Sequence, residues 1–189
     1  MTKRVFIVHR WEGNPEADWY PWLKKQLEEK GFQVEVPAMP DPDSPKIDEW
    51  VSFLREKVGD PDENTYFVGH SIGCQTILRY LETVPDTRIG GVVLVAGWIN
   101  LTSEVTEKPE EYHVAKPWLE APIEWDKIRN NNFVAVFSDN DPYVPIGDAK
   151  IFQEKLGARV VFESRKGHFT EEENVRELLI VLNELLRMA

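Results

Sequence analysis

The sequence has 189 residues, a length that suits one folded domain and is short for two. Hydrophobic residues make up 42% and charged residues 29% of the chain, which excludes a disordered protein and indicates a globular one. The formal net charge of −11 would repel a phosphate backbone or an anionic lipid surface. We therefore expect neither nucleic-acid nor membrane partners.

The single cysteine, Cys74, excludes an internal disulfide, so an oxidising compartment is not required. The apolar run Val5–Val8 near the start is too short for a signal peptide or a membrane span. These two features favour a cytoplasmic location.

Six short apolar runs, rich in β-branched and aromatic residues, are nearly all too short for helices and predict strands. Their hydrophobicity is continuous rather than alternating, which is typical of strands buried on both faces of a parallel sheet. The runs are Val5–Val8, Val34–Val36, Tyr66–Val68, Val92–Ala96, Phe133–Phe137 and Val160–Phe162.

Amphipathic stretches separate these runs and predict helices, because their apolar residues recur on one helical face. They cover Trp19–Leu27, Ile47–Leu54, Ile72–Leu81 and Leu178–Leu186. Alternating strands and helices predict an α/β fold in a single domain over residues 1–189, with helices on both sides of a mostly parallel sheet of about six strands.

The stretch Asn100–Asn131 breaks this alternation, since it is too long for an ordinary strand-to-helix connection. It carries three prolines and two tryptophans among many charged residues. We interpret it as a short, partly helical lid inserted in the domain.

Gly69-His70-Ser71-Ile72-Gly73 follows one predicted strand and opens the next predicted helix. In this context the G-x-S-x-G pattern indicates a nucleophile elbow, a strained turn that presents a serine above the sheet. The bare pattern also arises by chance, and the flanking strand and helix make that alternative less favoured. Ser71 is therefore the candidate nucleophile.

A serine hydroxyl needs a neighbouring base to take its proton. Of the four histidines, His168 follows the last predicted strand, where sites of such folds gather. His70 should point away from the neighbouring nucleophile and pack the elbow, His9 ends the first strand and His113 lies in the lid. We expect His168 to be the base; the alternative is an ordinary loop histidine.

The base needs a carboxylate to orient it, and two aspartates after the fifth predicted strand compete for this role. We favour Asp141 over Asp139, because the following proline stiffens its turn. The alternative is that both aspartates only cap a turn. The order serine, aspartate, histidine is that of the α/β-hydrolases.

An oxyanion would need two backbone N–H donors. Ile72, at the start of a helix, is one candidate; Trp11, in the loop after the first strand, is the other, with Arg10 as its alternative. Trp98 and Trp118 are candidates for an apolar substrate pocket, although core packing explains them equally well. Cys74 is expected to be a buried small hydrophobe.

No motif in the sequence implies a metal or a cofactor: there is no phosphate loop, no H-E-x-x-H pattern and no cysteine-containing metal cluster.

The chain resembles the α/β-hydrolase superfamily and, more narrowly, the small serine hydrolases grouped with retinoblastoma-binding protein nine and the bacterial YdeN-like proteins. The resemblance covers essentially the whole chain. Six stretches carry it: Trp19–Lys25, Met39–Pro42, Gly69–Gly73, Pro117-Trp118, Asp141–Pro145 and Gly167–Phe169.

This resemblance implies a compact core of about six parallel strands and a serine-hydrolase or carboxylesterase-like activity, with a triad of Ser71, Asp141 and His168. The chain departs from its relatives at Arg10, where they often have glycine. The arginine would narrow the site, alter the oxyanion loop or supply charge for an anionic substrate group.

We therefore expect hydrolysis of a small-molecule ester, with a thioester or an amide less favoured. The alternative is a hydrolase-fold binding protein, in which Arg10 marks a degraded oxyanion site and the lid tryptophans form a docking surface for a protein. The L-x-C-x-E motif tied to retinoblastoma binding is absent from the sequence.

Overall fold

The computed structural model describes residues 2–189 and contains a six-stranded, all-parallel sheet with the order β2-β1-β3-β4-β5-β6. Each of the six predicted apolar runs overlaps one strand, which confirms the predicted sheet. The strands are β1 (Arg4–Val8), β2 (Gln33–Glu35), β3 (Thr65–His70), β4 (Gly91–Val95), β5 (Phe133–Ser138) and β6 (Arg159–Glu163).

Burial explains why the central strands lack polar alternation. Every residue of β3, β4 and β5 is buried, because helices cover both faces of the sheet. The edge strand β6 is only partly covered, and Phe162 on it is 56% exposed. The continuous apolar pattern thus matches full burial in the three central strands, whereas the equally apolar run Val160–Phe162 lies on a partly exposed edge.

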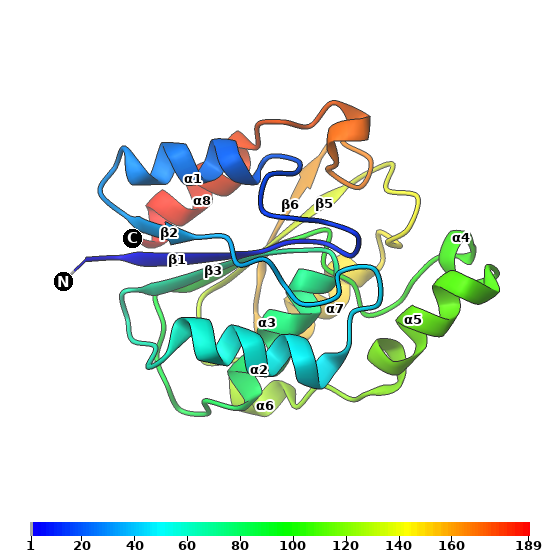
Figure 1. Ribbon diagram of the computed structural model, residues 1–189, viewed down its shortest axis with the longest axis horizontal. Coiled ribbons are helices and arrows are strands. Elements are labelled where there is room, and N and C mark those ends of the chain that lie inside the picture. The colour runs from blue at the N-terminus through cyan, green and yellow to red at the C-terminus, as the bar shows by residue number, and fades with distance from the viewer. Residues whose placement is uncertain (1) are drawn as a thin grey trace.

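Helices form a layer on each face of the sheet (Figure 1), so the predicted three-layer architecture is confirmed. On one face α1 (Tyr20–Glu28) packs beside α8 (Leu179–Met188). On the other, α2 (Ile47–Val58) packs against α3 (Ile72–Glu82), and α7 (Asp148–Leu156) packs on β5 and β6. The helix α7 is an addition to the predicted elements.

The segment 100–131 contains three helices, α4 (Ser103–Thr106), α5 (Pro109–Glu120) and α6 (Trp125–Ile128). Proline suits the start of α5, since a first-turn residue has no helical partner for its N–H. In Figure 1, α4 and α5 stand at the right, beyond the carboxyl ends of the strands. α6 instead packs against α3 and α7.

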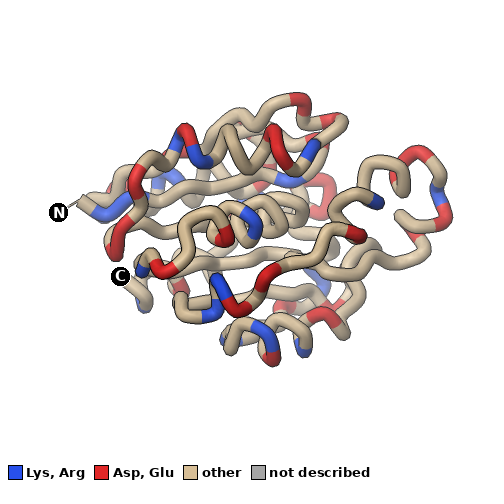
Figure 2. The backbone as a smooth tube through the Cα atoms, turned by 90° about the horizontal axis from the view of Figure 1, so that it is seen from below, with Lys and Arg blue, Asp and Glu red and all other residues tan. Residues whose placement is uncertain are grey.

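The backbone coloured by charge (Figure 2) shows lysine, arginine, aspartate and glutamate mainly on helices and loops, with the inner strands nearly free of them. This distribution matches the apolar core that the strands build. Among residues 2–189, no helix combines the length and apolarity needed to cross a bilayer.

Candidate active site

Ser71 occupies a strained turn between β3 and α3. Its φ of 54° and ψ of −118° lie in a region that residues with side chains rarely adopt. The flanking glycines are required by close backbone approach: a Cβ on Gly69 would lie 2.7 Å from the Cys74 nitrogen, and one on Gly73 would overlap the Val8 carbonyl oxygen. This local geometry is that of a nucleophile elbow.

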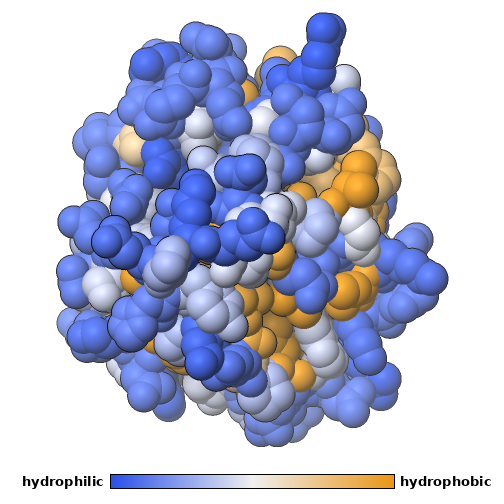
Figure 3. All heavy atoms as spheres, turned by 90° about the vertical axis from the view of Figure 1, so that its right-hand side faces the viewer, coloured by the Kyte–Doolittle hydropathy of each residue, from blue (hydrophilic) through white to orange (hydrophobic). Residues whose placement is uncertain are grey.

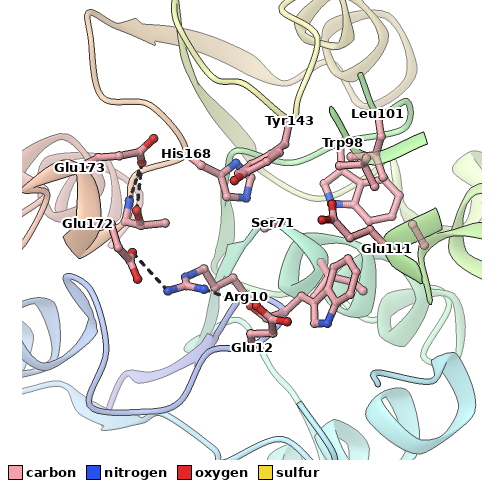
Figure 4. Close-up of a pocket in the computed structure, with 15 residues that line it drawn as sticks. Arg10, Glu12, Ser71, Trp98, Leu101, Glu111, Tyr143, His168, Glu172 and Glu173 are labelled. Carbon is pink, nitrogen blue, oxygen red and sulfur yellow. Dashed lines mark hydrogen bonds and ion pairs between the residues drawn. The ribbon is translucent and has the colours of Figure 1, made fainter. Parts of the chain in front are cut away.

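A cavity of about 430 Å³ opens above Ser71. The Ser71 hydroxyl has no hydrogen-bond partner among residues 2–189, and the side chain lines the cavity (Figure 4). The cavity walls come from five parts of the chain: Arg10, Trp11, Glu12, Ser71, Ile72, Trp98, Leu101, Val105, Glu111, Ala115, Tyr143, His168, Thr170, Glu172 and Glu173.

His168 lines this cavity, and Asp141 contacts its imidazole from outside the lining. The Nδ1 atom of His168 lies 2.8 Å from Oδ2 of Asp141, so Nδ1 carries the proton that the carboxylate accepts and Nε2 is left as the basic nitrogen. The other carboxylate oxygen accepts the backbone N–H groups of Tyr143, at 2.9 Å, and Val144, at 3.1 Å. These bonds fix the orientation of the imidazole ring.

Asp139, the competing acid, contacts a different part of the loop. Its carboxylate accepts hydrogen bonds from the Arg165 N–H at 2.7 Å and from the Ser164 hydroxyl at 2.8 Å, and these two bonds lower its pKa. Asp139 therefore stabilises the turn after β6. Of the two candidates, only Asp141 contacts His168.

Two other histidines are buried, and burial lowers the pKa of both. His70 contacts the Tyr20 hydroxyl at 2.6 Å and the His168 carbonyl oxygen at 2.7 Å, and does not line the cavity. His9 accepts the Met39 N–H at 3.1 Å. Both hold backbone segments in place.

The two residues expected to supply the oxyanion donors, Ile72 and Trp11, both line the cavity. Ile72 is the first residue of α3, so its N–H has no intrahelical acceptor. The Trp11 N–H has no acceptor among residues 2–189, whereas the Arg10 N–H contacts the Tyr20 hydroxyl at 3.2 Å. This difference favours Trp11 over Arg10.

The side chain of Arg10 lies against acidic neighbours. Its Nε donates to Asp18 Oδ2 at 2.9 Å, and Nη2 is 3.6 Å from Glu172 (Figure 4). Asp18 is fully buried, so this pairing neutralises the guanidinium in a poorly solvated place. The expectation that Arg10 supplies charge for an anionic substrate group is therefore not supported.

The tryptophans expected in the pocket have different places. Trp98 lines the cavity, but Trp118 does not, so its assignment was wrong. Trp118 is 1% exposed, its Nε1 donates to the Pro45 carbonyl at 3.0 Å, and its ring packs on Trp50. Trp118 is therefore the residue of α5 that enters the hydrophobic core.

The sequence reasoning missed several apolar wall residues: Leu101, Val105 and Ala115 from the 100–131 segment, and Tyr143, whose ring packs edge-on against His168. The position of Tyr143, two residues after the candidate acid, was a usable signal. Figure 3 shows the apolar surface of this face gathered within hydrophilic surroundings.

Cys74 is fully buried behind the elbow, and burial raises its pKa, as expected of a small hydrophobe. Within residues 2–189, no three His, Cys, Asp or Glu side chains are grouped to hold a metal ion.

Comparisons with known proteins show which family the chain belongs to. The family model described as serine hydrolase matches residues 5–186. YdeN of Bacillus subtilis, a protein named as a hydrolase, is 32% identical over 98% of this chain and 95% of its own length. The serine hydrolase RBBP9 of Rattus norvegicus is 29% identical over 100% of this chain and 97% of its own.

The crystal structure of the Bacillus subtilis ydeN gene product superposes with a TM-score of 0.90 at 29% identity, covering 99% of this chain and 98% of that one. A structure from a study of carboxylesterases of Nitrososphaera gargenis shares the fold, with a TM-score of 0.72 at 14% identity, covering 99% and 90% of the two chains. With a family model that spans nearly its entire length, the chain belongs to the serine hydrolase family and is a hydrolase of the α/β-hydrolase fold.

Proposed function

We propose that this hydrolase cleaves small carboxylic esters through a triad of Ser71, His168 and Asp141. The observation that carries the proposal is the 2.8 Å contact between His168 and Asp141 at the cavity that also contains the strained serine. It gives a nucleophile, a base and an orienting acid in one place.

In the proposed reaction, the Ser71 Oγ attacks the ester carbonyl while its proton passes to Nε2 of His168. The N–H groups of Ile72 and Trp11 bind the resulting oxyanion. His168 then gives the proton to the leaving alcohol oxygen, and an acyl-enzyme forms. Water deprotonated by the same imidazole attacks this acyl group and releases the acid.

The cavity walls support an ester with an apolar acyl group and no negative charge. Trp98, Leu101 and Val105 form an apolar side, and about 430 Å³ suits a small molecule. The lining also holds four glutamates and one arginine, and that arginine is paired with Asp18. An anionic group would meet net repulsion there. Thioesters and amides are less favoured substrates.

We also propose that the segment 100–131 is a cap within a single domain. Its residues Leu101, Val105, Glu111 and Ala115 contribute to the cavity wall. In this proposal the cap determines how large an acyl group the enzyme accepts.

An active-site label tests the function directly. A fluorophosphonate probe should react with the wild-type protein at Ser71, and the same preparation should hydrolyse p-nitrophenyl acetate or butyrate. Ser71→Ala should lose both the label and the turnover. Ser52→Ala, which changes an exposed serine on α2, should keep both.

A folded wild-type protein that neither takes the label nor hydrolyses any ester of the p-nitrophenyl series would overturn the esterase proposal. That result would favour the alternative of a hydrolase-fold binding protein.

A further inference from the structure

A buried polar cluster lies next to the site but outside the cavity lining. Tyr20 and His70 have no exposed surface, and the side chain of Asp18 is also fully buried. Buried polar groups are costly unless each has a partner. The esterase proposal assigns no role to any of these three residues.

The cluster forms a continuous chain of hydrogen bonds between two loops of the site. The Arg10 N–H lies 3.2 Å from the Tyr20 hydroxyl, the hydroxyl lies 2.6 Å from Nδ1 of His70, and Nε2 of His70 lies 2.7 Å from the His168 carbonyl oxygen. One end is the residue before Trp11, and the other is the backbone of the proposed base.

The chemistry of these groups fixes every proton in the chain. The His168 carbonyl only accepts, so Nε2 of His70 carries the hydrogen and Nδ1 is left to accept from Tyr20. The Tyr20 oxygen in turn accepts the Arg10 N–H. Burial lowers the pKa of His70 well below its ordinary value and raises that of Tyr20, so both stay neutral.

Asp18 makes a second connection between the same two loops. One carboxylate oxygen accepts from Arg10 Nε at 2.9 Å, and the other accepts the Glu171 N–H at 2.9 Å. Glu171 opens the short helix η1 (Glu171–Glu173) that follows His168. The loop after β1 and the loop after β6 are therefore joined twice, by side chains from the segment 18–20 and from β3.

We propose that Tyr20 and His70 are positioning residues: they set the oxyanion N–H of Trp11 and the imidazole of His168 at a fixed separation. The proposal rests on the proposed esterase function. Arg10 is bonded directly to Trp11 in the chain, and the His70 contact is to the backbone of His168 itself. Donors fixed before the reaction stabilise an oxyanion without reorganisation.

Tyr20→Phe tests this role, because it removes only the hydroxyl that joins Arg10 to His70. A displacement of about 1 Å costs roughly 100-fold in rate, so we expect kcat to fall about 10- to 100-fold with KM nearly unchanged. Affinity for an alkylboronic acid, whose oxygen occupies the oxyanion position in its serine adduct, should fall by a similar factor.

Tyr80→Phe is the matched control. Tyr80 is also fully buried, but its hydroxyl has no hydrogen-bond partner among residues 2–189. The control therefore removes the same atom from an equally buried tyrosine without breaking a hydrogen bond. Its kcat and boronate affinity should match those of the wild type.

A second pair of variants tests the other end of the chain. Gln at position 70 offers both a donor for the His168 carbonyl and an acceptor for Tyr20, whereas Leu offers neither. His70→Gln should therefore keep more of kcat than His70→Leu. Each rate is divided by the fraction of sites titrated with fluorophosphonate, which removes any contribution from unfolded protein.

Three results would overturn the positioning role: a Tyr20→Phe enzyme with the kcat of Tyr80→Phe, a loss confined to KM, or a loss that disappears when rates are divided by titrated sites. In each case the esterase proposal would survive, since the wild type is active. An inactive and unlabelled wild type would overturn both proposals together.

Discussion

Asp141 is the residue on which the proposed chemistry can be tested most sharply. Its Oδ2 accepts the Nδ1 proton of His168 at 2.8 Å, and its Oδ1 accepts two backbone N–H groups. In Asp141→Asn, one oxygen can still accept from the backbone while the amide donates to Nδ1. The proton then moves to Nε2, and the base is lost. We expect kcat to fall by roughly 10⁴-fold in p-nitrophenyl ester assays.

Asp139→Asn is the control for this substitution, because Asp139 lies two residues away and its carboxylate, among residues 2–189, bonds to Ser164 and Arg165 rather than to His168. Its kcat should stay within a few-fold of wild type. Comparable losses in the two variants would contradict the assignment of Asp141 as the orienting acid.

Among single residues, the sequence predicted those catalytic candidates that have a characteristic local motif. Ser71 and His168 stand next to glycines in recognisable turns, so their neighbourhood could be read from the chain. The choice between Asp139 and Asp141 had a weaker basis, since two residues of one turn differ only in the direction of their side chains. Trp118 was misassigned because burial depends on which helix covers it.

At the scale of elements, α3 connects the elbow to the segment 100–131. Three polar side chains on one face of this helix bond to the backbone of that region: Gln75 Nε2 to the Trp98 carbonyl, Arg79 to the carbonyls of Trp118 and Ala121, and the Glu82 carboxylate to the Glu124 N–H. The helix that begins after the nucleophile thus also holds the backbone just before the proposed cap and, within the cap, that of residues 118–124.

Arg79→Met should weaken this anchor. Nη2 of Arg79 donates to the Trp118 carbonyl at 2.9 Å and to the Ala121 carbonyl at 2.8 Å. Removing this buried donor leaves its two acceptors unsatisfied, at about 1–3 kcal/mol of unfolding free energy, a loss partly offset because Nε and Nη1 of Arg79 are buried without partners among residues 2–189. We expect a lower midpoint in urea and faster proteolytic cleavage within 100–131.

Arg129→Met provides the comparison, since the Arg129 side chain is largely exposed and forms a surface ion pair with Asp126 at 3.2 Å. Its urea midpoint should stay close to that of the wild type, because exposed ion pairs contribute little. An equal or larger loss in Arg129→Met would show that Arg79 does not hold the segment.

Whether an element could be predicted depends on how clearly its apolar residues follow the spacing of a strand or a helix. The central strands β3, β4 and β5 were predictable because both of their faces are covered. The helix α7 was missed because only Ala149, Phe152 and Leu156 form its buried apolar face. In the predicted helix Leu178–Leu186, five leucines were expected on one buried face, but Leu179 is 60% exposed and Leu186 37%, so this expectation was partly wrong.

At the scale of the whole molecule, the parallel topology brings the site together. Loops after β1, β3, β5 and β6 all lie at the carboxyl ends of their strands, the edge where such folds bind ligands. The sequence predicted this gathering through the fold class. It did not predict that Arg10 faces Asp18, because that contact depends on the path of the loop after β1.

The charge of the whole molecule leads to the last prediction. The net charge is −11, and four of the acidic residues line the cavity near the proposed reaction centre: Glu12, Glu111, Glu172 and Glu173. p-Nitrophenyl butyrate and mono-p-nitrophenyl succinate differ only in a terminal methyl and a carboxylate. We expect kcat/KM for the succinate to be at least about tenfold lower, because a repulsion of about 1.4 kcal/mol gives that factor.

Two measurements distinguish electrostatic repulsion of the succinate carboxylate from a steric effect: the dependence on salt and the effect of a single substitution. The Debye length falls from about 30 Å at 0.01 M salt to about 3 Å at 1 M, so the difference between the two esters should shrink over that range. Glu12→Gln should also reduce it, because Glu12 is an exposed member of the lining. If Arg10 instead received the carboxylate, the succinate would be preferred and Arg10→Gln would abolish that preference. We do not expect this result, because Arg10 is already paired with Asp18. A preference for the succinate would contradict the proposed repulsion between the cavity and an anionic substrate.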